Sequence, residues 1–279
     1  MITRRYFIKT GCAAGIGFGL NSIGLDNLST AKTVTVEPVT FGPKHHFFGY
    51  YGISPWNKSE TYLLGLEVER QDSMPEEDEK ASIGIFDAQT HKFQKIAETK
   101  AWNYQQGAIL HWNPLNTDSE INFNDKIGNQ IVTRKLNINT GRETILPRPI
   151  NGFSYNGKYA LSLDYGRLGR LRQVVGYSGI VDHSANDPAL KNSEIFLLDM
   201  KTGKSKFVVS YYQVYEYLRN RGVDFKGRHI WFNHVVFNKS DNRFFFLART
   251  RNPRNGDMET GMFTVNTDGS ELFEAILYG

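Results

Sequence analysis

Residues 195–210, IFLLDMKTGKSKFVVS, combine an apolar run that ends in aspartate, a short polar turn and a second apolar run. Two such runs around a polar turn that contains glycine are typical of a β-hairpin. The pattern recurs as IGIFDAQTHKFQKIAE from Ile83, IVTRKLNINTGRETIL from Ile131 and MFTVNTDGSELFEAIL from Met262. In each copy the first run ends in Asp or Asn, and these marker residues are Asp87, Asn137, Asp199 and Asn266, which lie 50, 62 and 67 positions apart.

Each hairpin is preceded by another pair of apolar runs, for example FSYNGKYALSLDYG before the third and HVVFNKSDNRFFFLAR before the fourth. Four strands per repeat of about 50 residues are the signature of a β-propeller blade. A β-sandwich of unrelated hairpins is the alternative, because regular strand spacing alone also fits it. We predict an all-β propeller domain at residues 32–279, with four four-stranded blades at roughly 45–98, 102–147, 150–210 and 229–279.

Two details refine this prediction. The four blades form either a small ring or an incomplete seven-bladed ring, because no strand after ELFEAILYG remains to close a larger one. Insertions at 166–192 and 211–228 interrupt the repeat, and such insertions often border a propeller's site. The second insertion contains the one convincing amphipathic helix, at 211–220. Inner strands should start near Tyr50, Ala108, Phe153 and His234.

The first segment, TRRYFIKTGCAAGIGFGL, pairs Arg4 with Arg5 ahead of Lys9 and a weakly apolar run rich in Gly and Ala. This order of features is typical of a twin-arginine signal peptide, which we place at residues 1–31. The signal predicts a periplasmic or secreted protein with no membrane association after cleavage. Cys12 is the only cysteine of the chain, so the mature protein would have no disulfide.

The charge of the chain argues against a nucleic-acid partner. The formal net charge is +4, and residues 1–31 contribute three basic residues against one acidic residue. Outside this segment no long basic run remains, so the sequence lacks the electrostatic footprint of a nucleic-acid-binding protein. With 40% hydrophobic and 22% charged residues, the chain has the composition of a folded globular domain.

The inner strands of a propeller line its central channel, so polar residues on or beside them are site candidates. The stretch HHFFGYYGISPWN supplies His45, His46 and Tyr50. Later repeats add candidates that include a cluster of arginines and tyrosines after the second strand of the third repeat. These further candidates are Gln105, Gln106, His111, Tyr165, Arg167, Arg170, Arg172, Tyr177, His229 and His234.

This set of side chains suits the β-elimination of a uronic-acid glycan. That reaction needs a base for the C5 proton, an acid for the leaving oxygen and cationic groups for the carboxylate. We expect the catalytic groups to be His46 or His45, with Tyr165 and Tyr177. Because neighbouring strand residues point to opposite faces, only one of the two histidines can face the channel, and we favour His46. The expected substrate-binding residues are Arg167, Arg170, Arg172, Tyr50, Gln105, Gln106, His111 and His234.

The motifs HHFFGYYGISPWN, NYQQGAILHW, LDYGRLGRLRQVVGYS and NHVVFNKSDNRFFFLAR resemble those of exported bacterial propeller proteins from polysaccharide-degrading systems. That group is similar in architecture to the oligogalacturonate lyases and ulvan lyases, which have seven blades. The resemblance implies a lyase that acts on an acidic polysaccharide or oligosaccharide. It also implies a divalent metal, for which His229, His234 and Gln106 are the candidates here. A glycoside hydrolase and a non-catalytic sugar-binding propeller remain the alternatives.

Overall fold

The repeated hairpins of the sequence form the outer half of four separate sheets. A computed structural model describes residues 36–50 and 52–279, and Pro38–Gly279 form one unit within the chain. The predicted signal segment 1–31, with Arg4 and Arg5, lies outside the described residues. In three hairpins the marker side chain accepts hydrogen bonds from backbone N–H groups two and three positions later, at Asp87, Asn137 and Asp199. The marker is therefore an Asx turn that reverses the chain.

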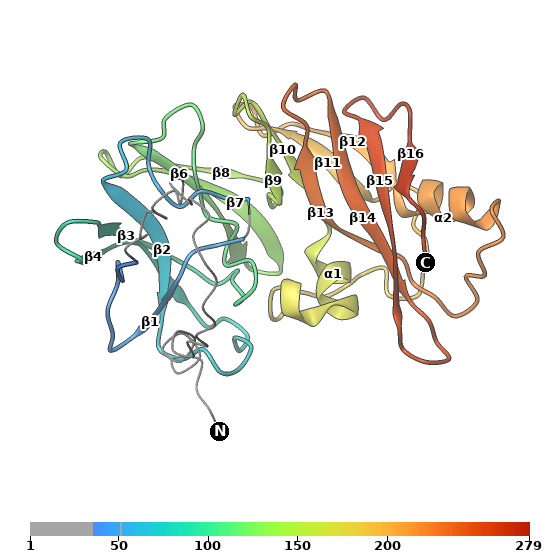
Figure 1. The fold of residues 1–279 in the computed structure, drawn as a ribbon, viewed down its shortest axis with the longest axis horizontal. Coiled ribbons are helices and arrows are strands. Elements are labelled where there is room, and N and C mark those ends of the chain that lie inside the picture. Colours follow the sequence, from blue (N-terminus) through green and yellow to red (C-terminus); the bar gives the residue numbers. More distant parts are fainter. Residues whose placement is uncertain (1–35, 51) are drawn as a thin grey trace, which may run out of the picture. The chain divides into compact units, whose positions relative to one another are not determined.

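All four sheets are four-stranded and antiparallel, and in each the strands pair in chain order (Figure 1). This arrangement confirms the predicted propeller blades and excludes a two-sheet sandwich. Blade 1 consists of β1 (His45–Phe47), β2 (Tyr62–Val68), β3 (Ala81–Asp87) and β4 (Phe93–Thr99), and blade 2 of β5 (His111–Trp112), β6 (Glu120–Ile127), β7 (Gln130–Asn137) and β8 (Glu143–Leu146). Blade 3 consists of β9 (Gly152–Phe153), β10 (Tyr159–Ser162), β11 (Glu194–Asp199) and β12 (Ser205–Ser210), and blade 4 of β13 (Trp231–Phe237), β14 (Arg243–Arg251), β15 (Met258–Asn266) and β16 (Phe273–Ile276).

The first strands of blades 1 to 3 are only two or three residues long, and they do not all start where we expected. β1 ends before Tyr50, and β5 starts after Ala108. The chain beyond β1 instead turns, with a hydrogen bond from the Ile53 N–H to the Tyr50 carbonyl. Tyr50 therefore lies in a turn and not in a strand. The alternation of side chains between the two faces of a strand, counted from His45, does not predict where Tyr50 points.

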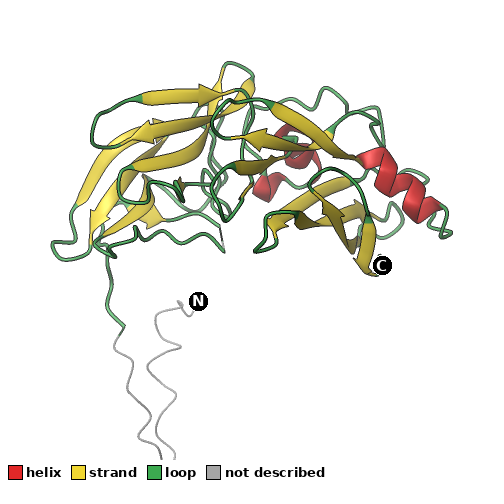
Figure 2. Cartoon of the chain, turned by 90° about the horizontal axis from the view of Figure 1, so that it is seen from above, coloured by secondary structure: helices red, strands yellow, loops and turns green. Residues whose placement is uncertain are grey.

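Two α-helices interrupt the strands of the described chain (Figure 2). The predicted helix is α2 (Tyr211–Arg219), which begins with a capping box between Ser210 and Gln213. Sequence analysis missed α1 (Tyr165–Leu171), whose N-terminus is capped by the Asp164 carboxylate. Its two glycines lower helix propensity and hide an apolar pattern in so short a segment. A single 3₁₀ turn (Gln173–Val175) follows α1.

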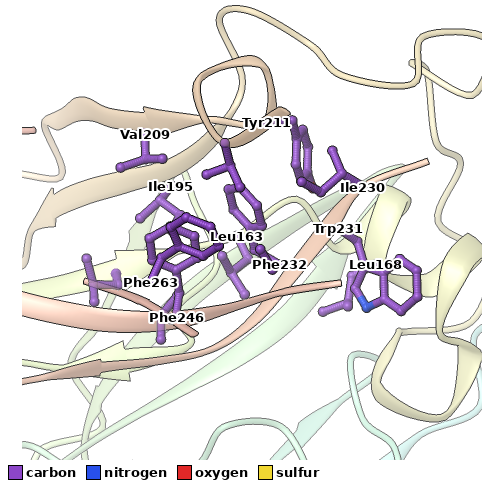
Figure 3. Packing of buried hydrophobic residues seen from close by; sticks show 14 of the residues in the cluster. Leu163, Leu168, Ile195, Val209, Tyr211, Ile230, Trp231, Phe232, Phe246 and Phe263 are labelled. Atoms are coloured by element: carbon purple, nitrogen blue, oxygen red, sulfur yellow. The ribbon is translucent and has the colours of Figure 1, made fainter. Parts of the chain in front are cut away.

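The core is divided between neighbouring blades. One cluster lies between blades 1 and 2, and a larger cluster fills blades 3 and 4 beneath both helices. Figure 3 shows the larger cluster, in which Phe232, Phe246 and Phe263 from three adjacent strands pack together. β9 of blade 3 lies against β13 of blade 4, so the first strands of these two blades are neighbours. Within the described part of the chain, no helix has the length and apolar character needed to cross a membrane.

Candidate functional site

The inner segments of all four blades surround a cavity of about 680 Å³. Three lining side chains that can transfer protons come from three blades: Tyr50 follows β1, His111 lies on β5 and His234 lies on β13. Ser54, Thr117, Asn151 and Ser154 add further polar side chains to the lining. Cavities of this size, largely apolar and with a few convergent polar groups, are the usual form of small-molecule sites. Other lining residues include Ile53, Trp56, Trp112, Phe153, Tyr155, Val236, Phe245 and Leu247.

Tyr50 and His234 form a pair across the cavity, although 184 positions separate them in the sequence. The Tyr50 hydroxyl lies 2.6 Å from His234 Nδ1 and 3.1 Å from Nε2, and the rings are stacked with centroids 5.4 Å apart. Burial raises the pKa of Tyr50 to about 12. Burial, together with the charge of Arg249, lowers the pKa of His234 to about 4. At neutral pH the pair is therefore a protonated phenol beside an unprotonated imidazole.

His111 adds a second neutral imidazole to the cavity. Its Nδ1 lies 2.7 Å from the Ile109 carbonyl oxygen. Because a carbonyl can only accept, Nδ1 carries the proton and Nε2 keeps its lone pair. Burial lowers the pKa of His111 to about 4, so this ring also stays neutral above acidic pH.

Two residues, one that lines the cavity and one that contacts His111 beside it, have a left-handed backbone conformation. Ile109 has φ = 49°, which is costly for a β-branched residue, and His234 has φ = 55°. His234 lies where the register of β13 and β14 shifts between Asn233 and Val236. Such conformations persist only where the surrounding structure imposes them, and they cluster at functional sites.

An arginine and a glutamine act on the Tyr50–His234 pair from nearby. Arg249, on β14, is close enough to Tyr50 and His234 to act on both of their pKa values. Burial lowers the pKa of Arg249, and the nearby charge of Arg172 lowers it further. Among the described residues, Arg249 Nε has no hydrogen-bond partner although it is buried. Gln106 is fully buried, and its effect on the pKa of Tyr50 opposes that of burial.

Of the residues expected to bind substrate, Tyr50, His111 and His234 line the cavity. Gln106 and Arg172 do not line it, although Gln106 acts on Tyr50 and Arg172 acts on Arg249. Arg249 was not singled out. The alternation Phe245–Leu247–Arg249 on one face of β14 could have indicated it, because the first two of these residues line the cavity.

The two histidines expected to include the base lie elsewhere. His46 Nε2 is 3.2 Å from Glu67 Oε2, and the ring packs on Phe86 and Phe93 of the same blade. His45 pairs with Val68 and points to the other face of blade 1. Because β1 ends at Phe47, the residue that reaches the cavity is Tyr50, and neither histidine lines it.

The two tyrosines expected to be catalytic are fully buried side by side. The Tyr165 and Tyr177 rings are stacked, with centroids 4.4 Å apart. Their hydroxyls accept hydrogen bonds from Asn151 and Asn124. Burial raises the pKa of both. These tyrosines connect blades 2 and 3 and are closed to a substrate in this structure.

Arg167 and Arg170, expected to clamp a carboxylate, are occupied by other groups. The Arg167 guanidinium is buried and donates to the backbone carbonyls of Ile230, Asp187 and Pro188. All three guanidinium nitrogens of Arg167 thus already donate to the backbone, and the side chain is not available to a substrate carboxylate. Arg170 Nε lies 2.8 Å from the Asp182 carboxylate. The third expected arginine, Arg172, lies near enough to Arg249 to lower its pKa, but it does not line the cavity. Gln105 is exposed in the loop next to Gln106.

The candidate metal ligands do not assemble into a site. His229 contacts Arg170, with Nδ1 and the guanidinium 3.3 Å apart, whereas Gln106 and His234 lie by the cavity. A neighbouring arginine opposes a bound cation. Across residues 36–50 and 52–279, no three His, Cys, Asp or Glu side chains gather so that they could hold a metal ion. His229, His234 and Gln106 therefore do not fit a divalent metal.

No protein-family model matches the chain, and no curated protein matches it. Solved structures do match. Oligogalacturonate lyase in complex with manganese has a TM-score of 0.54 at 12% identity, over 85% of this chain and 55% of that one. In fold, the chain is similar to oligogalacturonate lyase. A second such lyase, from Vibrio parahaemolyticus, has a TM-score of 0.51 at 10% identity, over 84% of this chain and 54% of its own.

TolB from Acinetobacter baumannii matches with a TM-score of 0.42 at 10% identity, over 86% of this chain and 56% of TolB. The chain thus spans just over half the length of these solved proteins. At identities this low, the likeness to the lyases establishes the propeller fold but no activity.

Proposed function

We propose that the protein is an exported enzyme that cleaves an acidic polysaccharide or oligosaccharide by β-elimination in the 680 Å³ cavity. The observation that carries this proposal is the Tyr50–His234 pair, 2.6 Å apart, with Arg249 beside it. Its members already hold the protonation states that the reaction needs, a neutral imidazole as base and a phenol as acid.

The proton balance of the reaction closes within the pair. His234 accepts the C5 proton of the uronate, the C4–O4 bond breaks, and Tyr50 donates its proton to the departing O4. A C4=C5 double bond forms in the product. The His234 imidazolium then returns a proton to the Tyr50 phenolate along their hydrogen bond. Arg249, whose charge already acts on both Tyr50 and His234, stabilises the charge that develops on the carboxylate.

The carboxylates of the third blade do not favour a hydrolase. Asp164 accepts hydrogen bonds from the Gly166 and Arg167 N–H groups as the cap of α1. Asp182 pairs with Arg170 and accepts from Ser184. A paired-carboxylate mechanism needs an acid and a second carboxylate on either side of the glycosidic bond, and these two side chains are held by other groups.

A product assay tests the proposal. The protein is incubated with uronic-acid glycans, and unsaturated product ends are followed by absorbance alongside reducing ends. A lyase produces both, a hydrolase only reducing ends, and a sugar-binding propeller neither. Either of the last two results would remove the proposal.

Variants then test the roles of the pair. Tyr50→Phe and His234→Ala should each lower turnover about 10²- to 10⁴-fold, because each removes a proton-transfer group. Tyr62→Phe is the matched control, since Tyr62 is exposed on β2 outside the cavity. Full activity of Tyr50→Phe would show that the hydroxyl transfers no proton.

A further inference from the structure

The cavity has two unlike sides. Tyr50, His111 and His234 supply its ionisable groups, whereas Val236, Phe245 and Leu247 of blade 4 form an apolar wall. Val236 pairs with Phe245 across β13 and β14, and Leu247 follows Phe245 on the same face. Val236 remains 42% exposed. The wall is therefore a continuous apolar surface that borders the candidate site.

An unsubstituted sugar does not fit this wall. The rim of a sugar ring carries hydroxyl groups that need hydrogen-bond partners once they leave water. The side chains of Val236, Phe245 and Leu247 can neither donate nor accept such bonds. The aromatic side chains of Trp56, Phe153 and Tyr155 also line the cavity, together with polar side chains at Ser54, Thr117, Asn151 and Ser154. Aromatic rings pack well against a flat apolar group.

We propose that the cavity binds a uronic acid that carries an aryl group at C1, with the aryl group against the wall of Val236, Phe245 and Leu247. The position of the sugar rests on the proposed function, in which Arg249 stabilises the carboxylate. The volume of about 680 Å³ lies within the range of sites for drug-sized ligands and can hold a sugar with such a substituent.

Binding of four compounds, measured by calorimetry at pH 7, separates the aryl from the carboxylate preference. The compounds are 4-nitrophenyl and methyl β-D-glucuronide, and 4-nitrophenyl and methyl β-D-glucoside. We expect the aryl glucuronide to bind about 10- to 100-fold more tightly than the methyl glucuronide, because burial of an aromatic group is worth this factor. Equal affinities of these two glucuronides would overturn the inference. Equal affinities of aryl glucuronide and aryl glucoside would instead count against the carboxylate clamp of the proposed function.

Variants of the wall locate the effect. Leu247→Gln should remove most of the aryl preference while the affinity for methyl glucuronide stays within about twofold. Val236→Thr keeps the side-chain shape and should reduce the preference in the same direction, so it serves if Leu247→Gln does not fold. Ile127→Gln is the control, because Ile127 is 47% exposed and does not line the cavity.

Two outcomes of the variant experiment would contradict the inference. In the first, Leu247→Gln weakens the aryl and methyl glucuronides by the same factor. In the second, sedimentation shows a dimer that Leu247→Gln dissociates, which would assign the wall to a contact between two copies of the chain.

Discussion

At the scale of single residues, burial decides which side chains can perform chemistry. Tyr50 and His234 keep opposite protonation states at neutral pH because burial raises the pKa of the first to about 12 and lowers that of the second to about 4. Tyr165 and Tyr177 are buried more completely, but their hydroxyls are occupied by asparagines. Tyrosine thus lines the cavity at Tyr50, whereas at Tyr165 and Tyr177 it is part of the buried core.

The lowered pKa of His234 sets the acidic limit of the proposed reaction. A base must be unprotonated, so kcat/KM should fall only as the pH drops through about 4, where His234 gains a proton. Tyr50 remains protonated up to about pH 12 and sets no limit below that. The measurement is kcat/KM for formation of the unsaturated product between pH 3.5 and 9. A fall of kcat/KM centred near pH 6.5 would instead indicate a histidine with an unperturbed pKa.

Protonation of buried histidines should also limit stability. His111 has a pKa of about 4 in the folded state and about 6.5 when unfolded, so the unfolded chain binds more protons between these values. Its contribution is therefore present above pH 6.5 and is lost as the pH falls toward 4. Urea unfolding of wild type and His111→Gln over this window should show a weaker pH dependence in the variant. Equal slopes would mean that His111 is not held neutral by the fold.

At the scale of elements, the blades depend on a turn that the sequence repeats. The Asp199 carboxylate accepts hydrogen bonds from the N–H groups of Lys201 and Thr202, between β11 and β12. Asn137 makes the equivalent bonds between β7 and β8 with its amide oxygen. The turn thus requires a short side chain with an acceptor oxygen, and this side chain need not be charged.

This comparison supplies a matched pair of variants. Asp199→Ala should lower the free energy of unfolding by about 1 kcal/mol, because two backbone donors lose their acceptor. Asp199→Asn should stay close to wild type at neutral pH, as blade 2 already uses Asn at this position. Urea denaturation measures both. Equal losses in the two variants would mean that the carboxylate charge, rather than the turn, stabilises the hairpin.

At the scale of the whole molecule, buried polar groups join blade to blade. The Arg167 side chain on α1 donates to the carbonyl of Ile230, the residue before β13, and so connects the insertion of blade 3 to blade 4. Asn124 of blade 2 exchanges hydrogen bonds with the backbone of Ile150, ahead of blade 3. Contacts of this kind lie between elements that are distant in the chain.

Replacing Arg167 should therefore affect stability rather than substrate affinity. Arg167→Met leaves three buried carbonyls without their donor and should cost at least about 2 kcal/mol of unfolding free energy. Arg142→Met, in an exposed turn, is the control and should change it by less than about 0.5 kcal/mol. A stable Arg167→Met protein with weakened glycan binding would instead restore Arg167 as a clamp.

Export is the second prediction for the whole chain. We expect that changing both Arg4 and Arg5 to Lys leaves the precursor in the cytoplasm, because the twin-arginine pair is recognised by a receptor and is not read as charge alone. Fractionation of cells that express the wild-type and double-Lys proteins measures this. Unchanged secretion of the double variant would exclude a twin-arginine signal.

The sequence alone determined the features that depend on neighbours along the chain. The Asx turns recur in the sequence because each hairpin forms from adjacent residues, and they were sufficient to predict four blades. α2 was predictable because Ser210 and Gln213 cap an amphipathic segment. The rule that inner strands line a channel also placed Tyr50, His111 and His234 near the site.

Only the tertiary structure decided which candidates face the cavity. Arg167 and Arg172 lie five positions apart in one insertion, yet Arg167 is buried among carbonyls of other segments and Arg172 lies near Arg249. Arg249 and Tyr50 are almost 200 positions apart, and no local pattern connects them. The physical reason is that burial and pKa depend on contacts between blades, which no spacing within a single repeat encodes.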